Sequence, residues 1–484
     1  MTQPTMPNEY PELSDRVVFD GAAPSEIVLS ELRATAVDLD FSSDARRDHG
    51  RDWWPLTIGW VSKGSAPALP VVVARPKTTQ DVSRLLAVAH EYSLPVTPQG
   101  GRSGVVGGAV PATGGVALDL TAMDAIISID EVSLTVTVEA GCFGPDLENA
   151  LNAKGFTVGH FPQSFALATV GGWLACRGAG QYSNRYGKIE DMVRGLTVVL
   201  ADGSVITTGS RGPRSASGPD LNQLFVGSEG TLGVITQATL VIHHKPDYEA
   251  RAAYSFASCE EGLEACRRIM QRGARPAVLR LYDEVESERS FTITRCALIV
   301  IDEGDPGLVD ATMKIVDEEC AVGQREDDAH VATWFEHRNN VSALAPLWSR
   351  DYVVDTIEIA APWAALSSIH RRVVEALTTL PETMVASMHQ SHAYQDGACL
   401  YFTFVAKPEG DLTAYYRAAW DAATAVVLAA GGALSHHHGV GRNRARFVRE
   451  ALGSGFDVLV DIKDTLDPHH IMNPGVLGIG GTSW

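Results

Sequence analysis

The spacing of apolar residues predicts alternating strands and helices from about residue 69 onward. A β-branched run at 71–75 is followed by TTQDVSRLLAVAHEY (78–92), whose apolar residues recur at the three- and four-residue spacing of one helix face. Thr78 and Asp81 match a capping box at the start of that helix. LPVTPQGG (94–101) then has the pattern of a strand entering a glycine loop. Together these segments predict one β-α-β unit.

Further strand patterns extend this region to residue 245. They are GVALDL (115–120), IISIDEVSLTVTVEAG (126–141), MVRGLTVVLADGSVIT (192–207) and LGVITQATLVIHH (232–244). ADGS (201–204) places an Asp-Gly pair between two apolar runs, which is the signal of a β-hairpin. Residues 69–245 are therefore expected to form one α+β domain rich in antiparallel strands.

A second region, residues 246–432, alternates strands with amphipathic helices. Its strands include RAAYSFAS (251–258), CALIVID (296–302) and CLYFTFVAK (399–407), and its helices EEGLEACRRIMQRG (260–273) and DLTAYYRAAWDAATAVVL (411–428). This pattern indicates a separate α/β layer, a substrate cap. Residues 433–484 are too few for a domain of their own, so we expect them to fold back onto the first domain.

Residues 1–68 predict an irregular N-terminal arm. It ends in RRDHGRDWWPLTIGW (46–60), where arginines, a histidine and tryptophans crowd together. Two interpretations stay open. The arm packs against the body through its tryptophans, or it forms a lid that brings cationic groups to a pocket.

Charge and cysteine usage narrow the protein class. The 39 Lys and Arg against 59 Asp and Glu give a net charge of −20, which argues against nonspecific binding to nucleic acid or anionic membrane. Seven scattered cysteines without a CxxC pair indicate neither a disulfide framework nor a zinc ribbon. No signal peptide or membrane-spanning stretch is expected. The sequence predicts a cytoplasmic enzyme, with peripheral membrane contact and a homodimer left open.

Three glycine-rich loops carry the candidate cofactor chemistry. PQGGRSGVVGGA (98–109) packs five glycines after a strand, and glycines expose backbone N–H groups that together bind anions. It matches neither GxGxxG nor GxxxxGK[ST]. ATVGGWLACRGAGQYSNRYGKIEDMV (168–193) and FVGSEGTLGVIT (225–236) supply two more loops in the same domain. The order of all three is far more specific than any one of them.

These motifs, with NPG at 473–475, resemble the FAD-binding domain of the vanillyl-alcohol oxidase (PCMH-type) flavoprotein superfamily. The resemblance implies a two-domain α+β flavoprotein with a PCMH-type domain and an α/β cap. It implies that the first loop wraps the diphosphate of FAD through Pro98, Gly100, Gly101, Arg102, Ser103 and Gly104. It also implies that the remaining cofactor contacts come from Thr169, Gly171, Gly172, Glu229, Gly230 and Ile235.

A histidine triplet points to one branch of this superfamily. Where many members carry EHG(I/V)G, this chain has SHHHGVG (435–441), which resembles the alkyl-dihydroxyacetonephosphate synthases. The resemblance implies catalytic roles for Tyr401, Arg350 and the histidines His436, His437 and His438. It also implies that flavin N5 holds the dihydroxyacetone phosphate carbon while a fatty acid leaves and a fatty alcohol enters. Net oxidation does not occur.

Other interpretations of these residues stay open. Tyr401 lies in an apolar strand and also fits a core position, and Arg350 also fits a surface ion pair. Of three adjacent histidines, at most two are expected to face one site, and His437 and His438 are favoured. The segment between Arg350 and Tyr401 is shorter than in the synthases, which puts a long acyl tunnel in doubt.

A metal-dependent reaction is the competing hypothesis. Related 2-hydroxy-acid dehydrogenases often hold a divalent metal with HxGDGNxH and the glutamate of EHGxG. Here Ala398 and Cys399 stand near the place of the second histidine, and His437 replaces the glutamate. No metal is therefore expected, although His389, His392 and His437 are a conceivable zinc set. The alternative function is FAD-linked oxidation of a small D-2-hydroxy acid, with Arg350 holding its carboxylate. A flavin-binding protein without catalysis is disfavoured.

The first loop contains no histidine, the residue through which some relatives bond the flavin. We predict noncovalent FAD: the purified protein should be yellow, and acid precipitation should release all the flavin into the supernatant. Absorbance of the two fractions checks this, and colour kept in the pellet would contradict it.

Overall fold

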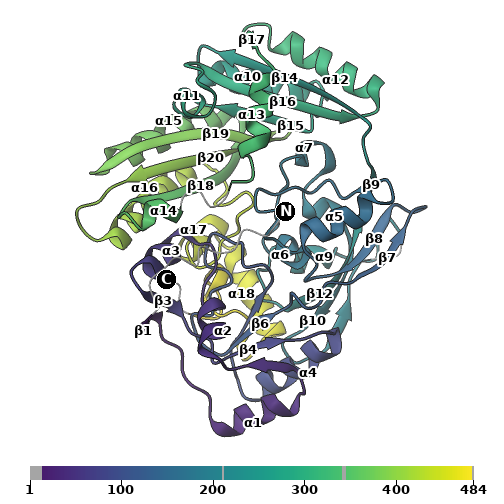
Figure 1. Cartoon of the computed structure of the whole chain (residues 1–484), viewed down its shortest axis with the longest axis vertical. Helices are drawn as coiled ribbons and strands as arrows, with labels where there is room; N and C mark the ends of the chain where they lie inside the picture. The colour runs from purple at the N-terminus through teal and green to yellow at the C-terminus, as the bar shows by residue number, and fades with distance from the viewer. Residues whose placement is uncertain (1–13, 210–211, 341–344, 482–483) are drawn as a thin grey trace.

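The computed structural model describes residues 14–209, 212–340, 345–481 and 484. Figure 1 shows an N-terminal domain (residues 14–244, purple to teal) below a cap (residues 248–430, teal to green). Most of the C-terminal segment (residues 433–481, yellow) lies against the N-terminal domain. This architecture confirms the predicted α+β class of two packed domains.

The predicted β-α-β unit forms, but its two strands are not neighbours. The first sheet has the order β2-β4-β6-β5, with β2 (Asp38–Asp40), β4 (Val72–Arg75), β6 (Val116–Asp119) and β5 (Val96–Gln99). Strand β6 pairs in parallel with both β4 and β5 and so separates them. Helix α4 (Thr79–Glu91) covers the sheet, and Thr78 Oγ1 accepts a hydrogen bond from the Asp81 backbone N–H as a helix N-cap.

A second, antiparallel sheet in this domain carries the second and third glycine loops. Its order is β11-β10-β12-β8-β7, with β7 (Ile126–Asp130), β8 (Thr135–Glu139), β10 (Val193–Val199), β11 (Val205–Thr207) and β12 (Val234–Val241). Strands β10 and β11 pair antiparallel, which confirms the hairpin at 201–204. The segments between its strands contain α5 (Gly144–Asn152), α6 (Val170–Ala175), α7 (Ser183–Tyr186), α8 (Ile189–Met192) and α9 (Asn222–Phe225). Two short strands, β9 (Phe156–Thr157) and β13 (His243–His244), pair beside them.

The cap is one seven-stranded antiparallel sheet with helices. Its order is β17-β14-β16-β15-β19-β20-β18, with β14 (Tyr248–Phe256), β15 (Val278–Tyr282), β16 (Cys296–Gly304), β17 (Gln324–Glu326), β18 (Val353–Pro362), β19 (Thr383–Ala393) and β20 (Gly397–Ala406). Its helices are α10 (Cys259–Gln271), α11 (Glu284–Phe291), α12 (Pro306–Glu319), α13 (Ala329–His337), α14 (Ala345–Trp348), α15 (Trp363–Thr379) and α16 (Leu412–Ala429).

Alternating residues of β16 show why both faces of the cap sheet are covered. Leu298 and Val300 join the core that α10, α12 and α15 pack onto, whereas Ala297 and Ile299 join the cluster around Trp334 of α13. Side chains alternate between the two faces of a strand, so this apolar run is buried on both sides.

The N-terminal arm is more regular than predicted. It contains β1 (Ser14–Phe19), α1 (Glu26–Ala34), α2 (Ser43–Asp48), α3 (Pro55–Ser62) and β3 (Ser65–Ala68). Trp54 is fully buried, and its indole N–H donates to the Tyr416 hydroxyl of the cap at 2.9 Å. Arg46 donates to the carbonyl of Pro70. The structure thus favours the packing arm over a cationic lid.

Helix α7 of the N-terminal domain is tied to the cap by polar side chains. Arg185 Nη1 contacts Asp302 Oδ1 at 3.0 Å, and the Tyr186 hydroxyl donates to Glu303 Oε1 at 2.6 Å. Ser183 Oγ lies 2.9 Å from His392 Nδ1. These three contacts from one short helix fix the cap against the glycine-loop domain.

The C-terminal segment returns to the first sheet. It contains a 3₁₀ turn (η2, Ala445–Phe447), α17 (Val448–Leu452), α18 (Gly455–Leu466) and a second 3₁₀ turn (η3, Val476–Gly478). Val96 of β5 bridges to Met472, and the buried Lys463 Nζ donates to the carbonyls of Thr231 and Met472. Among the described residues, no helix combines the length and apolarity needed to cross a bilayer.

Candidate active site

A cavity of about 780 Å³ lies between the glycine loops, the cap sheet and the histidine loop. All twelve residues expected to bind the cofactor line it: Pro98, Gly100, Gly101, Arg102, Ser103, Gly104, Thr169, Gly171, Gly172, Glu229, Gly230 and Ile235. Tyr401, His437 and His438 line it too, whereas His436 and Arg350 do not. The fold therefore gathers most of the sequence-predicted residues around one space.

The first glycine loop has the properties of an anion-binding nest. Within the described chain, the backbone N–H groups of residues 100–104 donate no hydrogen bond to another protein group. A Cβ built on Gly104 meets only Asp52 Oδ2, at 3.9 Å, and one built on Gly172 meets only Thr169 Oγ1, at 3.4 Å. Free N–H groups beside open space suit a diphosphate and a flat ring that approach the main chain.

Two other glycines serve the protein itself. A Cβ on Gly101 would stand 1.7 Å from the carbonyl oxygen of Leu167, and one on Gly171 would stand 2.8 Å from Ala140 Cβ. At these positions the first and second loops pack so closely against neighbouring residues that there is no room for a side chain. A side chain at either position would therefore displace the loops that form the cavity.

Two buried carboxylates hold the histidine loop, residues 435–441. Glu229 of the third glycine loop accepts hydrogen bonds from the backbone N–H groups of Val440 (2.6 Å) and Gly441 (2.8 Å). Burial raises the pKa of Glu229 to about 7. Although Glu229 was expected to contact FAD, its carboxylate is used to anchor this loop.

Glu358 of β18 is the second anchor and is fully buried. It accepts from the Ser435 hydroxyl (2.8 Å) and from the backbone N–H groups of all three histidines, including His438 (3.0 Å). Arg444 Nη1 lies 2.9 Å from Glu358 Oε1. Burial opposes ionisation, but Arg444 and the histidines outweigh it and hold the pKa of Glu358 well below its ordinary value. The carboxylate is therefore charged at neutral pH.

Tyr401 of β20 stands among imidazoles. Its ring stacks on His389 (4.7 Å between centroids) and on His437 (6.2 Å), and meets His438 edge-on at 5.4 Å. Burial raises the pKa of Tyr401 well above its ordinary value, and a hydrogen bond with Thr356 offsets this only in part. The phenol is thus a proton donor at neutral pH.

The neighbouring histidines are neutral. Burial lowers the pKa of His437 to about 3 and that of His438 to about 4. His438 Nδ1 is buried without a hydrogen-bond partner among the described residues. His436 faces away from the cavity, where its Nε2 lies 2.5 Å from the Tyr394 hydroxyl and its ring stacks on His392. The expectation that His437 and His438 share one site fits this placement.

Arg280 lines the cavity, whereas Arg350 does not. Arg350 is exposed in the turn after α14, and neighbouring Asp351 pairs with Lys63 at 3.2 Å. Arg280 of β15 lines the cavity, and its Nη2 donates to His389 Nε2 at 2.7 Å. The sequence does contain a signal for Arg280, because it is the one charged residue between Leu279 and Leu281 in an otherwise apolar strand. A buried charge is costly unless it is paired, so an arginine at such a position usually has a partner.

The cavity has two chemically different walls. The cationic wall consists of Arg280 and Arg338, whose guanidinium groups lie over the Trp334 ring at 5.7 and 5.3 Å. The apolar wall consists of Trp53, Pro55, Ile58, Leu167 and Trp348, of which Trp53, Pro55 and Ile58 come from the N-terminal arm. One cavity can therefore accept a molecule with an anionic and an apolar part.

Substitution by valine should have different effects at the two kinds of glycine. Gly172→Val should fold but lose FAD, because its side chain would enter the cavity. Gly101→Val should not fold, because its Cβ collides with backbone. Flavin absorbance and far-ultraviolet circular dichroism of each purified variant check this.

Gly410→Val is the matched control, since a Cβ there meets nothing within 4 Å. It should keep both fold and flavin. A yellow Gly172→Val protein would contradict the assignment of the open face to FAD.

Glu358→Gln should destabilise the protein by about 3–5 kcal/mol, because it leaves Arg444 and several N–H groups without their buried anion. Urea unfolding monitored by fluorescence measures this. The difference from wild type should be constant above about pH 5 and shrink as the pH falls below the ordinary glutamate pKa of about 4.3, because the depressed pKa stabilises the fold only while the carboxylate is ionised.

The exposed Glu450→Gln serves as the control and should change stability by less than about 0.5 kcal/mol. Equal stability of both variants would show that Glu358 is not an anchor.

Comparison with known proteins agrees with this geometry. The model of the FAD binding domain family matches residues 70–209, and that of the FAD linked oxidases, C-terminal domain, matches residues 245–477. The FAD-linked oxidoreductase YgcU of Escherichia coli O157:H7 is 34% identical, over 84% of this chain and 89% of the relative. The alkyldihydroxyacetonephosphate synthase of Caenorhabditis elegans is 30% identical, over 95% of this chain and 84% of the relative.

A further relative and a solved structure are also similar to this chain. The glycolate oxidase subunit GlcD of Bacillus subtilis (strain 168) is 28% identical, over 84% of this chain and 89% of the relative. A solved alkyldihydroxyacetonephosphate synthase superposes with a TM-score of 0.79 at 26% identity, over 97% of this chain and 90% of that chain. The loops, the cavity and these matches lead to one conclusion: the chain belongs to the FAD-linked oxidase family, and its cofactor is FAD.

Proposed function

We propose that this FAD enzyme carries out an alkyl-dihydroxyacetonephosphate synthase reaction, in which a fatty alcohol replaces the acyl group of an acyl-dihydroxyacetone phosphate. The observation that carries the proposal is the group formed by Tyr401, His438 and Arg280 in the FAD cavity. FAD, when bound, supplies an electrophilic, redox-active ring. The protein supplies the binding and the proton transfers.

The two walls of the cavity support this substrate class. Arg280 and Arg338 offer fixed cations for a phosphate, and the apolar wall offers a surface for a hydrocarbon chain. Removing one such charged contact typically costs about 1.5–3 kcal/mol, or roughly 10–150-fold in affinity.

Tyr401 and His438 suit the proton transfers. Loss of a carboxylic acid requires no strong acid, but entry of an alcohol requires a base that removes its proton. His438 lines the cavity and offers a ring nitrogen as that base, and the protonated Tyr401 phenol donates to the departing oxygen. Glu358 lies 3.7 Å from His438 Nδ1 and stabilises the imidazolium that forms.

FAD-linked oxidation of a small D-2-hydroxy acid is the second candidate function. Arg280 could hold its carboxylate, and His438 could take the hydroxyl proton while a hydride passes to the flavin. Relatives support this candidate as well, since GlcD and the D-lactate dehydrogenase 1 of Saccharomyces cerevisiae match at 28% and 29% identity.

Anaerobic mixing separates the two functions. An acyl-dihydroxyacetone phosphate should perturb the flavin spectrum without net reduction and should exchange its acyl group for an added fatty alcohol, detected by mass spectrometry. D-lactate, glycolate and 2-hydroxyglutarate should leave the flavin oxidised. Stoichiometric bleaching by any of these acids would decide for the oxidoreductase.

Variants test the residue roles. Tyr401→Phe should lower kcat by roughly 10²–10⁴-fold through loss of the proton donor. Arg280→Ala should lower kcat/KM by at least roughly 10-fold. Arg350→Ala is the control and should behave as wild type, because Arg350 lies outside the cavity.

A further inference from the structure

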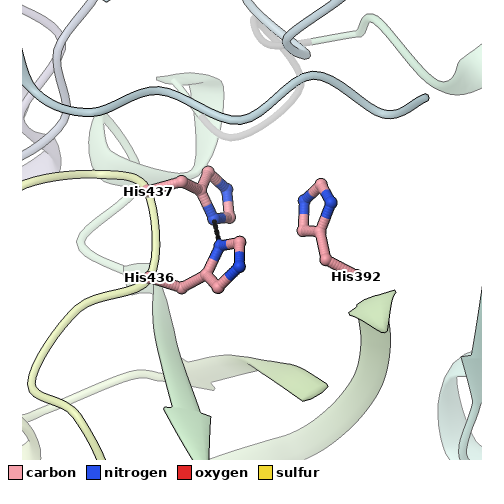
Figure 2. A group of neighbouring side chains, drawn as sticks. All are labelled: His392, His436 and His437. Atoms are coloured by element: carbon pink, nitrogen blue, oxygen red, sulfur yellow. Dashed lines mark hydrogen bonds between the residues drawn. The ribbon is translucent and has the colours of Figure 1, made fainter. Parts of the chain in front are cut away.

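Three histidines meet behind the catalytic group. His392 ends β19, and His436 and His437 lie in the histidine loop. Each can offer one ring nitrogen such that all three nitrogens lie within 4.8 Å of one another. Figure 2 shows His436 and His437 on one side of a gap and His392 facing them from the other, with the Nδ1 atoms of His436 and His437 2.9 Å apart.

The second nitrogen of two of these rings is already occupied. His392 Nδ1 lies 2.9 Å from Ser183 Oγ, which leaves Nε2 for a ligand. His436 Nε2 lies 2.5 Å from the Tyr394 hydroxyl, which leaves Nδ1. Hydrogen bonds to the far nitrogen fix tautomer and ring orientation in metal-binding histidines, and such partners are present here.

The backbone that carries two of the ligands is also fixed. Glu358 accepts hydrogen bonds from the backbone N–H groups of His436 and His437. These bonds fix the backbone from which both imidazole rings project. A set of nitrogen ligands without a carboxylate favours zinc over magnesium, calcium or manganese.

We propose that His392, His436 and His437 bind one Zn²⁺ through three nitrogens, with a fourth position open. Zinc–nitrogen bonds of about 2.0–2.1 Å place tetrahedral ligands about 3.3–3.4 Å apart, so the rings must close by at most about 1.5 Å. The sequence motif argues against a metal, because its glutamate and second histidine are missing. The fold nevertheless brings His436 and His437 close to His392.

The zinc site adds a binding point for an oxygen atom. His437 also lines the cavity, so the open position lies next to the substrate space. A zinc ion there would polarise a carbonyl or hydroxyl oxygen. Tyr401 and His438 are outside the ligand set and stay available for proton transfer. The site is independent of which of the two reactions the enzyme performs.

Metal analysis of the FAD-loaded protein tests the site. After chelator treatment and dialysis, titration with Zn²⁺ should give one equivalent in the calorimeter, whereas Mn²⁺ and Mg²⁺ should bind much more weakly. His392→Gln and His436→Gln should each abolish this equivalent while keeping flavin and circular dichroism. X-ray absorption should show nitrogen ligands at about 2.0–2.1 Å.

His469→Ala is the matched control, because this exposed histidine near His90 lies outside the ligand set. It should keep the full zinc equivalent. Less than stoichiometric zinc in the wild type, or one equivalent retained in both His392→Gln and His436→Gln, would overturn the proposal. The measurement uses no substrate, so its failure leaves the flavin experiment unaffected.

Discussion

The active site depends on a loop without regular structure that two buried carboxylates hold from opposite domains. Glu229 of the N-terminal domain and Glu358 of the cap accept the backbone N–H groups of residues 436–438, 440 and 441. Burying a carboxylate is costly unless charge and hydrogen bonds offset it, and the N–H groups with Arg444 do so for Glu358. The same contacts that fix the histidines thus join the two domains.

This construction explains how distant segments make one site. Arg280, Tyr401 and His438 lie on two strands and a loop of different parts of the chain, and Trp53 comes from the N-terminal arm. Strands of an antiparallel sheet provide rigid supports, and the loop supplies the proton carriers. Flavin binding, substrate binding and proton transfer therefore rest on one connected set of contacts.

The sequence predicted what local chemistry encodes. The glycine loops and the hairpin at 201–204 follow from short motifs whose spacing is fixed by the backbone, whereas the resemblance to the synthases implied that Tyr401 and the histidines act together. The separation of β4 from β5, the regular N-terminal arm and the exchange of Arg350 for Arg280 depend on strand order and register, which are set by contacts far apart in the chain. The anchoring role of Glu358 could not be predicted, because the residues near it in the sequence do not indicate that its partners are the N–H groups of three histidines far along the chain.

The polar contacts of α7 with the cap bear on how the two domains are held together. Swinging the cap away would strip Arg185 from Asp302, whose side chain is fully buried, and leave that charge uncompensated. A hinged-open form must therefore do without this ion pair and the Tyr186–Glu303 hydrogen bond, which favours the closed arrangement. The four residues of α7 thus hold the cap closed over the glycine-loop domain.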